Sequence, residues 1–286
     1  MKNVVGIDIG GTNIVGGRIE GNVIAAQLSE ETNALEGGSR TLDILKGIIG
    51  KLMTDETTAV GIGVPSVVDR ERGIVYNVQN IRDWDEVHLK EILEKEFNLP
   101  VFVDNDANCF AYGEKIFGKG KELDHFVGIT LGTGVGGGII QNGHLLKDAN
   151  CGSGEFGELP YLDSILEEYC GSRFFLRQGN ISGYEAALKV REGDVKSIAL
   201  YQEYGKHIAI LVKFILLIID PQAVIFGGSI ARSFGLFEKS MYEGLQDFPY
   251  PNSVKKLKIL TSELQSSGVL GAGALCIHDR RELHTP

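Results

Sequence analysis

Two glycine-rich stretches of the chain resemble each other, and this internal repeat constrains the fold more than any other feature. Residues 5–24 read VGIDIGGTNIVGGRIEGNVI, and residues 127–146 read VGITLGTGVGGGIIQNGHLL. They align without a gap, so that Gly6, Gly10, Gly16 and Gly21 fall on Gly128, Gly132, Gly138 and Gly143. Each copy predicts two strands joined by a glycine-rich turn and followed by a polar turn. The repeat therefore predicts two related halves, each opening with one such hairpin.

The two glycine-rich turns are candidate phosphate-binding loops. A turn without side chains lets backbone N–H groups approach an anion closely, and two turns suggest two walls of one phosphate site. A single hairpin of this kind is more often only a turn, so the hypothesis depends on the second copy. The first copy carries Asp8 where the second carries Thr130. An acid on one side only is what a single contact to a divalent metal or to phosphate-bound water requires.

Composition excludes several classes of protein. The 286 residues suffice for two domains, and 43% of them are hydrophobic. A net charge of −10 argues against binding to duplex nucleic acid. Because Val4 already reads as strand, we expect neither a DNA-binding extension before it nor a signal peptide, and we expect a cytoplasmic protein. The longest apolar run, residues 208–219, contains Lys213 and is too short for a bilayer, so it predicts a buried helix.

The four cysteines show no paired spacing. Cys109, Cys151, Cys170 and Cys276 lie in different predicted elements, and no CxxC motif is present. We therefore expect free thiols rather than disulfides, as in a reducing compartment.

Strands and helices alternate after the first hairpin, which is typical of an α/β fold rather than a sandwich. The pattern predicts strands at residues 60–65, 99–103, 223–226 and 257–260. It predicts helices at residues 41–53, 89–97, 109–116, 167–178, 183–190, 195–217 (as one or two helices), from 230 onward and at 268–277.

Six segments, in order, carry a resemblance to a known family. They are GIDIGGTN at 6–13, GIGVPSVVD at 61–69, NDAN at 105–108, LGTGVGGG at 131–138, GEFGE at 154–158 and IFGGS at 225–229. Together they resemble the ROK family of sugar kinases and related regulators, which is glucokinase-like and has an actin-like and hexokinase-like ATPase fold. The resemblance covers nearly the whole chain. It implies a duplicated, ribonuclease H-like α/β fold with two lobes around a nucleotide and sugar cleft, the first formed by residues 1–117 and 268–286 and the second by 118–267.

The resemblance also implies roles for individual residues in an ATP-dependent sugar kinase. Asp106 matches the general base, and Asp8 matches the acid that holds hydrated Mg²⁺ through water. The residues that match the sugar-binding set are Asn80, Asn105, Asp106, Glu155 and Glu167, together with Glu158 at a variant position. Those that match the β- and γ-phosphate loops are Gly10, Gly11, Thr12, Asn13, Gly132, Thr133 and Gly134. Those that match the adenosine loop are Gly227, Gly228 and Ser229.

The residues themselves leave alternatives open. Asp106 follows a predicted strand end, where open α/β sheets bind ligands, but Asp104, Asn105 and Asp106 could equally be a helix N-cap cluster. Asn105 suits sugar hydroxyls because an amide both donates and accepts. The Gly227–Gly228–Ser229 sequence could be an ordinary strand-to-helix turn.

The sequence departs from the family pattern at the usual zinc-binding segment. Glu158 stands where many members have a histidine, and residues 159–170 contain no cysteine cluster. Cys151 and Cys170 cannot form a four-ligand site alone, so we predict no zinc. Glu158 beside Glu155 would raise one carboxyl pKa if both were buried, so either the sugar preference is altered or Glu158 points elsewhere. Ser66 replaces the usual glycine of another loop, which is a milder departure.

Three functions remain open from the sequence. The first is a kinase that acts on a hexose or an N-acetylated amino sugar with ATP and Mg²⁺, and the intact Asp8, Asp106 and phosphate turns favour it. The second is a sugar-sensing transcriptional regulator of the same family, which the acidic charge disfavours. The third is a non-catalytic homologue that binds sugar or nucleotide. A homodimer is expected from the family resemblance alone.

Overall fold

The computed structural model describes residues 3–78, 81–147 and 149–282 and divides the chain into two compact units. Unit 1 comprises residues 1–121, 145–153 and 264–286, and unit 2 comprises residues 122–144 and 154–263. The sequence-based boundaries placed residues 145–153 in the second lobe, whereas here they pack with unit 1. The chain leaves unit 2 after His144 and returns to it at Gly154.

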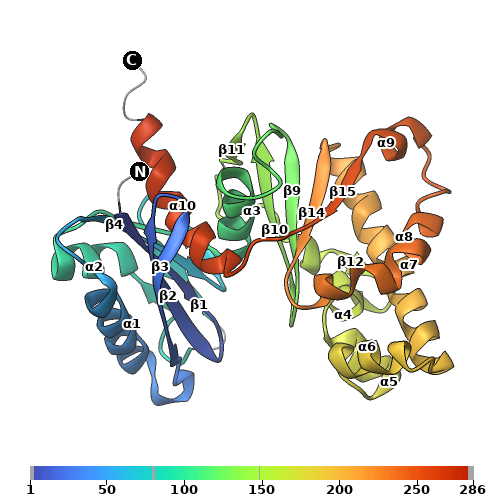
Figure 1. Cartoon of the computed structure of the whole chain (residues 1–286), viewed down its shortest axis with the longest axis horizontal. Helices are drawn as coiled ribbons and strands as arrows, with labels where there is room; N and C mark the ends of the chain where they lie inside the picture. The colour runs from blue at the N-terminus through green and yellow to red at the C-terminus, as the bar shows by residue number, and fades with distance from the viewer. Residues whose placement is uncertain (1–2, 79–80, 148, 283–286) are drawn as a thin grey trace. The chain divides into compact units, whose positions relative to one another are not determined.

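Unit 1 is built on a five-stranded mixed sheet (Figure 1). Its strands, in spatial order, are β3 (Val23–Glu31), β2 (Asn13–Glu20), β1 (Asn3–Ile9), β4 (Thr57–Val64) and β8 (Val101–Asn105). The first three pair antiparallel, and β1, β4 and β8 pair parallel. The parallel strands therefore end at one edge of the sheet, which is where such sheets bind ligands.

Helices cover both faces of this sheet. The helices of unit 1 are α1 (Gly38–Leu52), α2 (Leu89–Phe97), α3 (Asp106–Ile116) and α10 (Ser267–Glu282). Ile44, Ile48 and Leu93 bring α1 and α2 into the main core with β1, β4 and β8. Helices α3 and α10 pack together on the opposite face, where Val269 joins a second cluster. A small sheet, made of β5 (Val67–Asp69), β6 (Ile74–Tyr76) and β7 (Glu86–Val87), completes the unit with a 3₁₀ turn at Ala34–Glu36.

Unit 2 repeats the same sheet topology. Its strands, in spatial order, are β11 (His144–Leu145), β10 (Val135–Gln141), β9 (Phe126–Leu131), β14 (Ala223–Gly227) and β15 (Lys258–Thr261). As in unit 1, an antiparallel hairpin is followed by two parallel pairings. The helices are α4 (Leu166–Cys170), α5 (Arg173–Gly179), α6 (Gly183–Arg191), α7 (Val195–Ile218), α8 (Phe234–Gly244) and α9 (Pro251–Lys256). Unit 2 also contains a two-stranded sheet of β12 (Pro160–Tyr161) and β13 (Ser164–Ile165) and 3₁₀ turns at Phe156–Glu158 and Ile230–Ser233.

The hairpin repeat is real, but its gapless alignment is wrong by one residue in the second strand. Gly6 pairs with Gly17, whereas Gly128 pairs with Gly138. Gly17, not Gly16, is therefore the structural counterpart of Gly138. The cause is the turn: the innermost pair is Ile9 with Ile14 in the first hairpin but Leu131 with Val135 in the second, so the second turn is one residue shorter.

Most predicted elements are present. The segment 195–217, predicted as one or two helices, forms the single helix α7. The predicted helix at 167–178 is instead two helices, because the helix is interrupted at Gly171 and Ser172. Strand β3 was not predicted, although its residues alternate between exposed and partly exposed positions.

The apolar run at residues 208–219 forms the last half of α7, but only part of it is buried. Ile208, Leu211 and Ile215 are fully buried, whereas Leu217 and Ile218 are 57% and 59% exposed. Among the residues that the structure describes, no helix has the length and apolarity needed to cross a bilayer. All four cysteines are free thiols.

Glycines in β1 and β4 allow α10 to lie directly on the strand backbones. A Cβ atom on Gly61 would lie 1.9 Å from the carbonyl oxygen of Ala272, and one on Gly6 would lie 2.2 Å from that of Val269. Both contacts are far shorter than van der Waals distance, so any side chain at these positions would push the helix away.

We therefore expect Gly61→Ala to destabilise the protein by about 2 kcal/mol or more, because a well-packed interface must open to admit the methyl group. Gly50→Ala is the matched control, since Gly50 is exposed on α1 and a Cβ there meets nothing within 4 Å. It should be neutral or stabilising by about 0.5–1 kcal/mol. Urea unfolding of both variants measures the difference, and equal stability of the two would contradict this packing.

Candidate functional site

The carboxyl ends of the parallel strands in unit 1 bring the predicted acids together. Asp8 pairs with Gly63 across β1 and β4, and Gly63 pairs with Asp104 across β4 and β8. Asp8 and Asp104 therefore lie two strands apart, about 10 Å between Cα atoms. The Cα of Asp106 approaches Gly63 so closely that a Cβ there would lie 3.6 Å from it. Asp8 and Asp106 thus lie at the same edge of the sheet.

Asp8 lies against the start of α10. A Cβ on Gly268 would lie 2.0 Å from a carboxylate oxygen of Asp8, so only glycine at this position leaves room for the acid. Burial raises the pKa of Asp8 above its ordinary value. A desolvated carboxylate at the carboxyl edge of a sheet is a suitable partner for a cation or for a cation's bound water.

The first glycine-rich turn is fixed by Thr32, which the sequence analysis did not single out. The N–H of Gly10 donates to the carbonyl of Asn13 at 2.9 Å and closes the turn. The Thr32 hydroxyl donates to the Gly10 carbonyl at 2.7 Å, and its backbone N–H donates to the Thr12 carbonyl at 2.9 Å. Gly11, Thr12 and Asn13 are exposed. The tip of the turn is therefore exposed to solvent, while Thr32 binds the carbonyls of Gly10 and Thr12.

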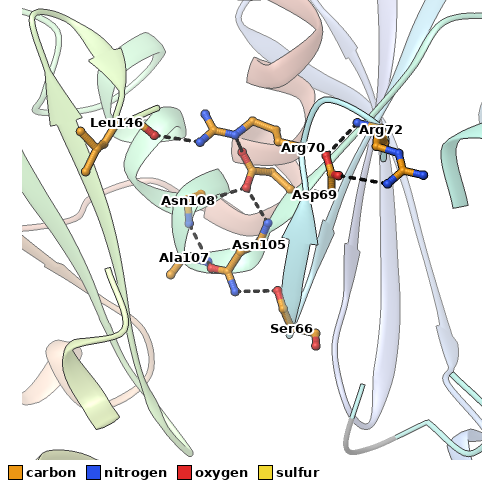
Figure 2. Close-up of polar contacts among 9 residues, drawn as sticks. Ser66, Asp69, Arg70, Arg72, Asn105, Ala107, Asn108 and Leu146 are labelled. Atoms are coloured by element: carbon orange, nitrogen blue, oxygen red, sulfur yellow. Dashed lines mark hydrogen bonds and ion pairs between the residues drawn. The ribbon is translucent and has the colours of Figure 1, made fainter. Parts of the chain in front are cut away.

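At the N-terminus of α3, the helix-cap role and the candidate-base role belong to different residues. Asn105 is the N-cap: its side-chain oxygen accepts from the backbone N–H groups of Ala107 at 2.8 Å and Asn108 at 3.3 Å. Its amide nitrogen donates to the Ser66 carbonyl at 3.1 Å (Figure 2). Asp106 is the first residue of the helix, and its carboxylate accepts from the N–H of Ala107 at 2.9 Å. The cap alternative therefore applies to Asn105, while Asp106 stays a candidate base.

The sequence analysis considered Asp104 only as a possible member of a helix N-cap cluster, and it did not indicate Arg70. Asp104 is 2% exposed, and Arg70 forms an ion pair with it at 3.2 Å. The signal available in the sequence was an acid directly before the NDAN segment, at a strand position that alternation turns inward. Its partner Arg70 comes from a loop that is distant in the sequence and carries no motif.

The second glycine-rich turn, in unit 2, is held by α4. The N–H of Gly132 donates to the Gly134 carbonyl at 3.0 Å, and the Gly132 carbonyl accepts from the N–H of Ser172 at 2.8 Å. A carboxylate oxygen of Glu167 accepts from the N–H of Val135 at 3.1 Å. The acid predicted to bind sugar therefore also supports the predicted phosphate turn, which includes Thr133.

Three carboxylates of unit 2 influence one another. Glu155 precedes the 3₁₀ turn Phe156–Glu158, and Glu167 lies in α4. Burial raises the pKa of Glu155, and the negative charges of Glu158 and Glu167 raise it further. The structure thus brings the three acids of the predicted sugar set in unit 2 into electrostatic contact. Asn80, the remaining member, lies outside the described residues.

The predicted adenosine loop follows β14. Gly228 has φ of 87°, and a Cβ there would lie 2.4 Å from the carbonyl oxygen of Leu131. Both features require glycine at this position. Gly227 ends β14 and Ser229 precedes the 3₁₀ turn Ile230–Ser233, so the ordinary-turn alternative has a structural basis as well.

A hydrogen-bonded aromatic cluster occupies the segment where the family pattern led us to consider zinc. The hairpin of β12 and β13 places the Tyr161 hydroxyl 3.0 Å from Nδ1 of His207 on α7. Tyr169 packs against both rings, with centroid distances of 5.1 and 5.0 Å. Within the described part of the chain, no group of three or more His, Cys, Asp or Glu side chains is arranged to hold a metal ion. The β12–β13 hairpin connects Glu158 and Glu167 along the chain.

The buried His207 predicts a pH-dependent stability. Burial lowers the pKa of His207, the negative charge of Glu203 opposes this by raising it, and the positive charge of Lys206 lowers it slightly further. As pH falls through the unfolded-state value of about 6.5, the unfolded chain takes up a proton that the folded protein resists. Stability contributed by neutral His207 is therefore present above that pH and is lost below it.

We expect His207→Gln to weaken the acid-induced loss of stability between pH 7.5 and 5.5, as measured by urea unfolding at both pH values. His88→Gln, at an exposed position, serves as the control and should keep the parent's pH dependence. An unchanged pH dependence in His207→Gln would contradict the role assigned to the histidine.

The sheet topology and the two glycine-rich hairpins define a class of protein. Two sheets of the same topology, each opening with a glycine-rich hairpin, form a duplicated actin-like ATPase fold. A model of the ROK family matches residues 4–279, and the chain belongs to this family.

Relatives of known name include both enzymes and a regulator. A glucokinase of Thermotoga maritima is 30% identical over 308 residues, which cover 95% of this chain and 96% of that protein. A xylose repressor of Bacillus subtilis is 28% identical over 298 residues, which cover 96% of this chain and 76% of the repressor. A ROK family glucokinase of Streptomyces griseus, solved with glucose and AMPPNP, is 26% identical with a TM-score of 0.82, covering 96% of this chain and 98% of that chain.

Proposed function

We propose that this protein transfers a phosphoryl group from ATP to a hydroxyl of a hexose or an N-acetylhexosamine, with Asp106 as general base. The observation that carries the proposal is the placement of Asp106 at the first position of α3, on the same strand edge as Asp8. The glucokinase relatives in sequence and structure support the same reaction class.

In the proposed reaction, Asp106 accepts the proton of the attacking sugar hydroxyl. The hydroxyl oxygen forms a bond to the γ-phosphorus as the bond from that phosphorus to the β,γ-bridging oxygen breaks, and ADP leaves with the bond's electron pair. The proton on Asp106 then passes to solvent. Because Asp106 lies at the amino end of α3, the helix dipole favours its ionised form before reaction.

The phosphates of ATP are proposed to bind the two glycine-rich turns. In unit 1, Gly10, Gly11, Thr12 and Asn13 form a turn with an exposed tip, and in unit 2 the matching residues are Gly132, Thr133 and Gly134. Gly227, Gly228 and Ser229 are proposed to contact adenosine.

Magnesium fits the donor set at Asp8. This carboxylate is desolvated and is given room only by the missing side chain of Gly268, which suits a hydrated divalent cation. When bound, Mg²⁺ would neutralise negative charge on the transferred phosphoryl group. Asp8 would hold it through water.

The sugar is proposed to bind the remaining polar residues: Asn80, Asn105, Glu155, Glu158 and Glu167. The side-chain oxygen of Asn105 already accepts two hydrogen bonds in the helix cap, and one amide hydrogen is donated to the Ser66 carbonyl. Asn105 can therefore offer a sugar mainly its second amide hydrogen. Burial and the negative charges of Glu158 and Glu167 raise the pKa of Glu155, whose carboxylate oxygens are proposed to accept from sugar hydroxyls.

A sugar-sensing regulator is the second candidate, because a xylose repressor is among the relatives. A regulator would bind sugar and respond to it without needing the base. A homologue that binds sugar or nucleotide without turnover is the third. Activity of the purified chain separates the first candidate from the other two.

The decisive test is ADP release with Mg-ATP across a panel of hexoses and N-acetylhexosamines. We expect turnover on at least one sugar and a loss of roughly 10²–10⁴-fold in kcat for Asp106→Asn, with little change in sugar affinity. Asp43→Asn, at an exposed position on α1, is the matched control and should keep full activity.

Full turnover by Asp106→Asn would show that Asp106 is not the general base. Absence of turnover on every sugar, with ATP binding still measurable by calorimetry, would favour the regulator or the non-catalytic homologue.

We also propose a cytoplasmic homodimer, on the family resemblance alone. Sedimentation equilibrium should give twice the 31.1 kDa chain mass, and a mass equal to one chain would refute it.

A further inference from the structure

The carboxylate of Asp104, two residues before the proposed base, is buried. One of its oxygens accepts from the backbone N–H of Asn105 at 2.8 Å and from the side-chain amide of Asn108 at 2.9 Å. The other oxygen pairs with Nε of Arg70 at 3.2 Å. A buried charge is tolerated when it is paired and hydrogen-bonded, and removal of one partner is costly.

Arg70 joins three segments of unit 1 that are far apart in the sequence. It follows β5 directly, its Nε reaches Asp104 at the end of β8, and a terminal nitrogen donates to the Leu146 carbonyl at 2.8 Å (Figure 2). Leu146 belongs to residues 145–153, the segment through which the chain leaves unit 2 and returns to it. The neighbouring Glu71 and Lys147 pair at 3.1 Å between the same two segments. The planar fork of a guanidinium suits such a divided role, which an ammonium cannot reproduce.

These contacts frame the first turn of α3. Asp104 holds the N–H of Asn105 on one side of Asp106 and the side chain of Asn108 on the other. Asn105 in turn caps the helix and binds Ser66. The backbone that carries Asp106 is therefore fixed from both sides by a carboxylate whose charge is matched by Arg70.

The same region is crowded with negative charge. Burial raises the pKa of the Cys109 thiol, and the charges of Asp104, Asp106 and Asp8 raise it further, so all three carboxylates act on one buried point. Asp104 comes from β8, Asp106 from α3 and Asp8 from β1, while Arg70 brings a positive charge from the loop after β5.

We propose that Arg70 is a positioning residue for Asp106, acting through the buried Asp104 to fix the first turn of α3 and to offset its negative charge. The proposal rests on the proposed kinase function for its kinetic consequences, whereas the positioning of α3 can be tested without activity. Arg70 does not need to touch substrate in this role. The same residue ties the amino end of α3 to residues 145–153, so the order of that segment depends on it.

The test compares Arg70→Gln with Arg72→Gln. Arg72 lies in the same loop, is 66% exposed and pairs with Asp69 at 3.9 Å, so its variant controls for loss of a loop cation (Figure 2). Amide hydrogen exchange of residues 104–112 and 143–153 should speed up at least about tenfold in Arg70→Gln and stay at the parent's rate in Arg72→Gln.

Kinetics test the charge balance separately. Loss of the Arg70 charge leaves Asp104 uncompensated and favours a proton on Asp106, so the acid limb of the kcat/KM profile should move to higher pH by about 0.5–1 unit. We expect kcat to fall about 10–100-fold with sugar KM within about threefold. Arg70→Lys should restore the acid limb but not the slow exchange at residues 143–153.

Asp104→Asn is expected to shift the acid limb in the opposite direction. It also provides a test if Arg70→Gln does not fold. It removes the negative charge, keeps an acceptor oxygen and should move the acid limb to lower pH. Parent-like exchange in Arg70→Gln, or an acid limb that moves in the same direction in Arg70→Gln and Asp104→Asn, would overturn the proposal. If the parent phosphorylates no sugar, the kinase function fails, and exchange alone then decides whether Arg70 positions α3.

Discussion

The close contact between α10 and the backbones of β1 and β4 is the constraint on which the rest of unit 1 depends. It exists because Gly6 and Gly61 have no side chain where the helix carbonyls pass. This contact returns the end of the chain to the first sheet and sets Gly268 beside Asp8. The same helix packs on α3, where a Cβ on Gly271 would lie 2.1 Å from the carbonyl of Cys109. The packing of one helix thus determines the surroundings of both proposed catalytic acids.

The carboxylates of Asp8 and Asp104, near the carboxyl ends of β1 and β8, have different surroundings. Asp8 is desolvated and lies in β1 beside the start of α10, which leaves it available to a cation. Asp104 is buried deeper, and its charge is matched by Arg70 and by two N–H donors. Asp106 lies between these two environments at the first position of α3. An arrangement in which one acid is paired and another is left for a ligand is typical of sites where neighbouring carboxylates have different tasks.

The two copies of the hairpin have diverged in a way that matches separate roles. The first turn is longer, carries Asp8 on the preceding strand and is supported from behind by Thr32. The second turn is one residue shorter. It is supported by the Glu167 carboxylate, from α4, and by the backbone N–H of Ser172, which follows α4. In unit 2 the element that supports the turn also carries a predicted sugar ligand. A shift of α4 would therefore affect both.

Local sequence determined much of this protein. Glycine turns, apolar periodicity and helix caps act over a few residues, so the repeated hairpins, helix α2 and strand β14 follow from the pattern. The strand that carries Asp8 and the strand end that precedes Asp106 follow from it as well. The tertiary structure decided what depends on distant partners: the one-residue register difference between the hairpins, the packing of residues 145–153 with unit 1, the capping role of Asn105, and the contact of Glu167 with Val135. Above all it decided the pairing of Arg70 with the buried Asp104, because this ion pair joins residues 34 positions apart and neither residue alone has a pattern that indicates its partner.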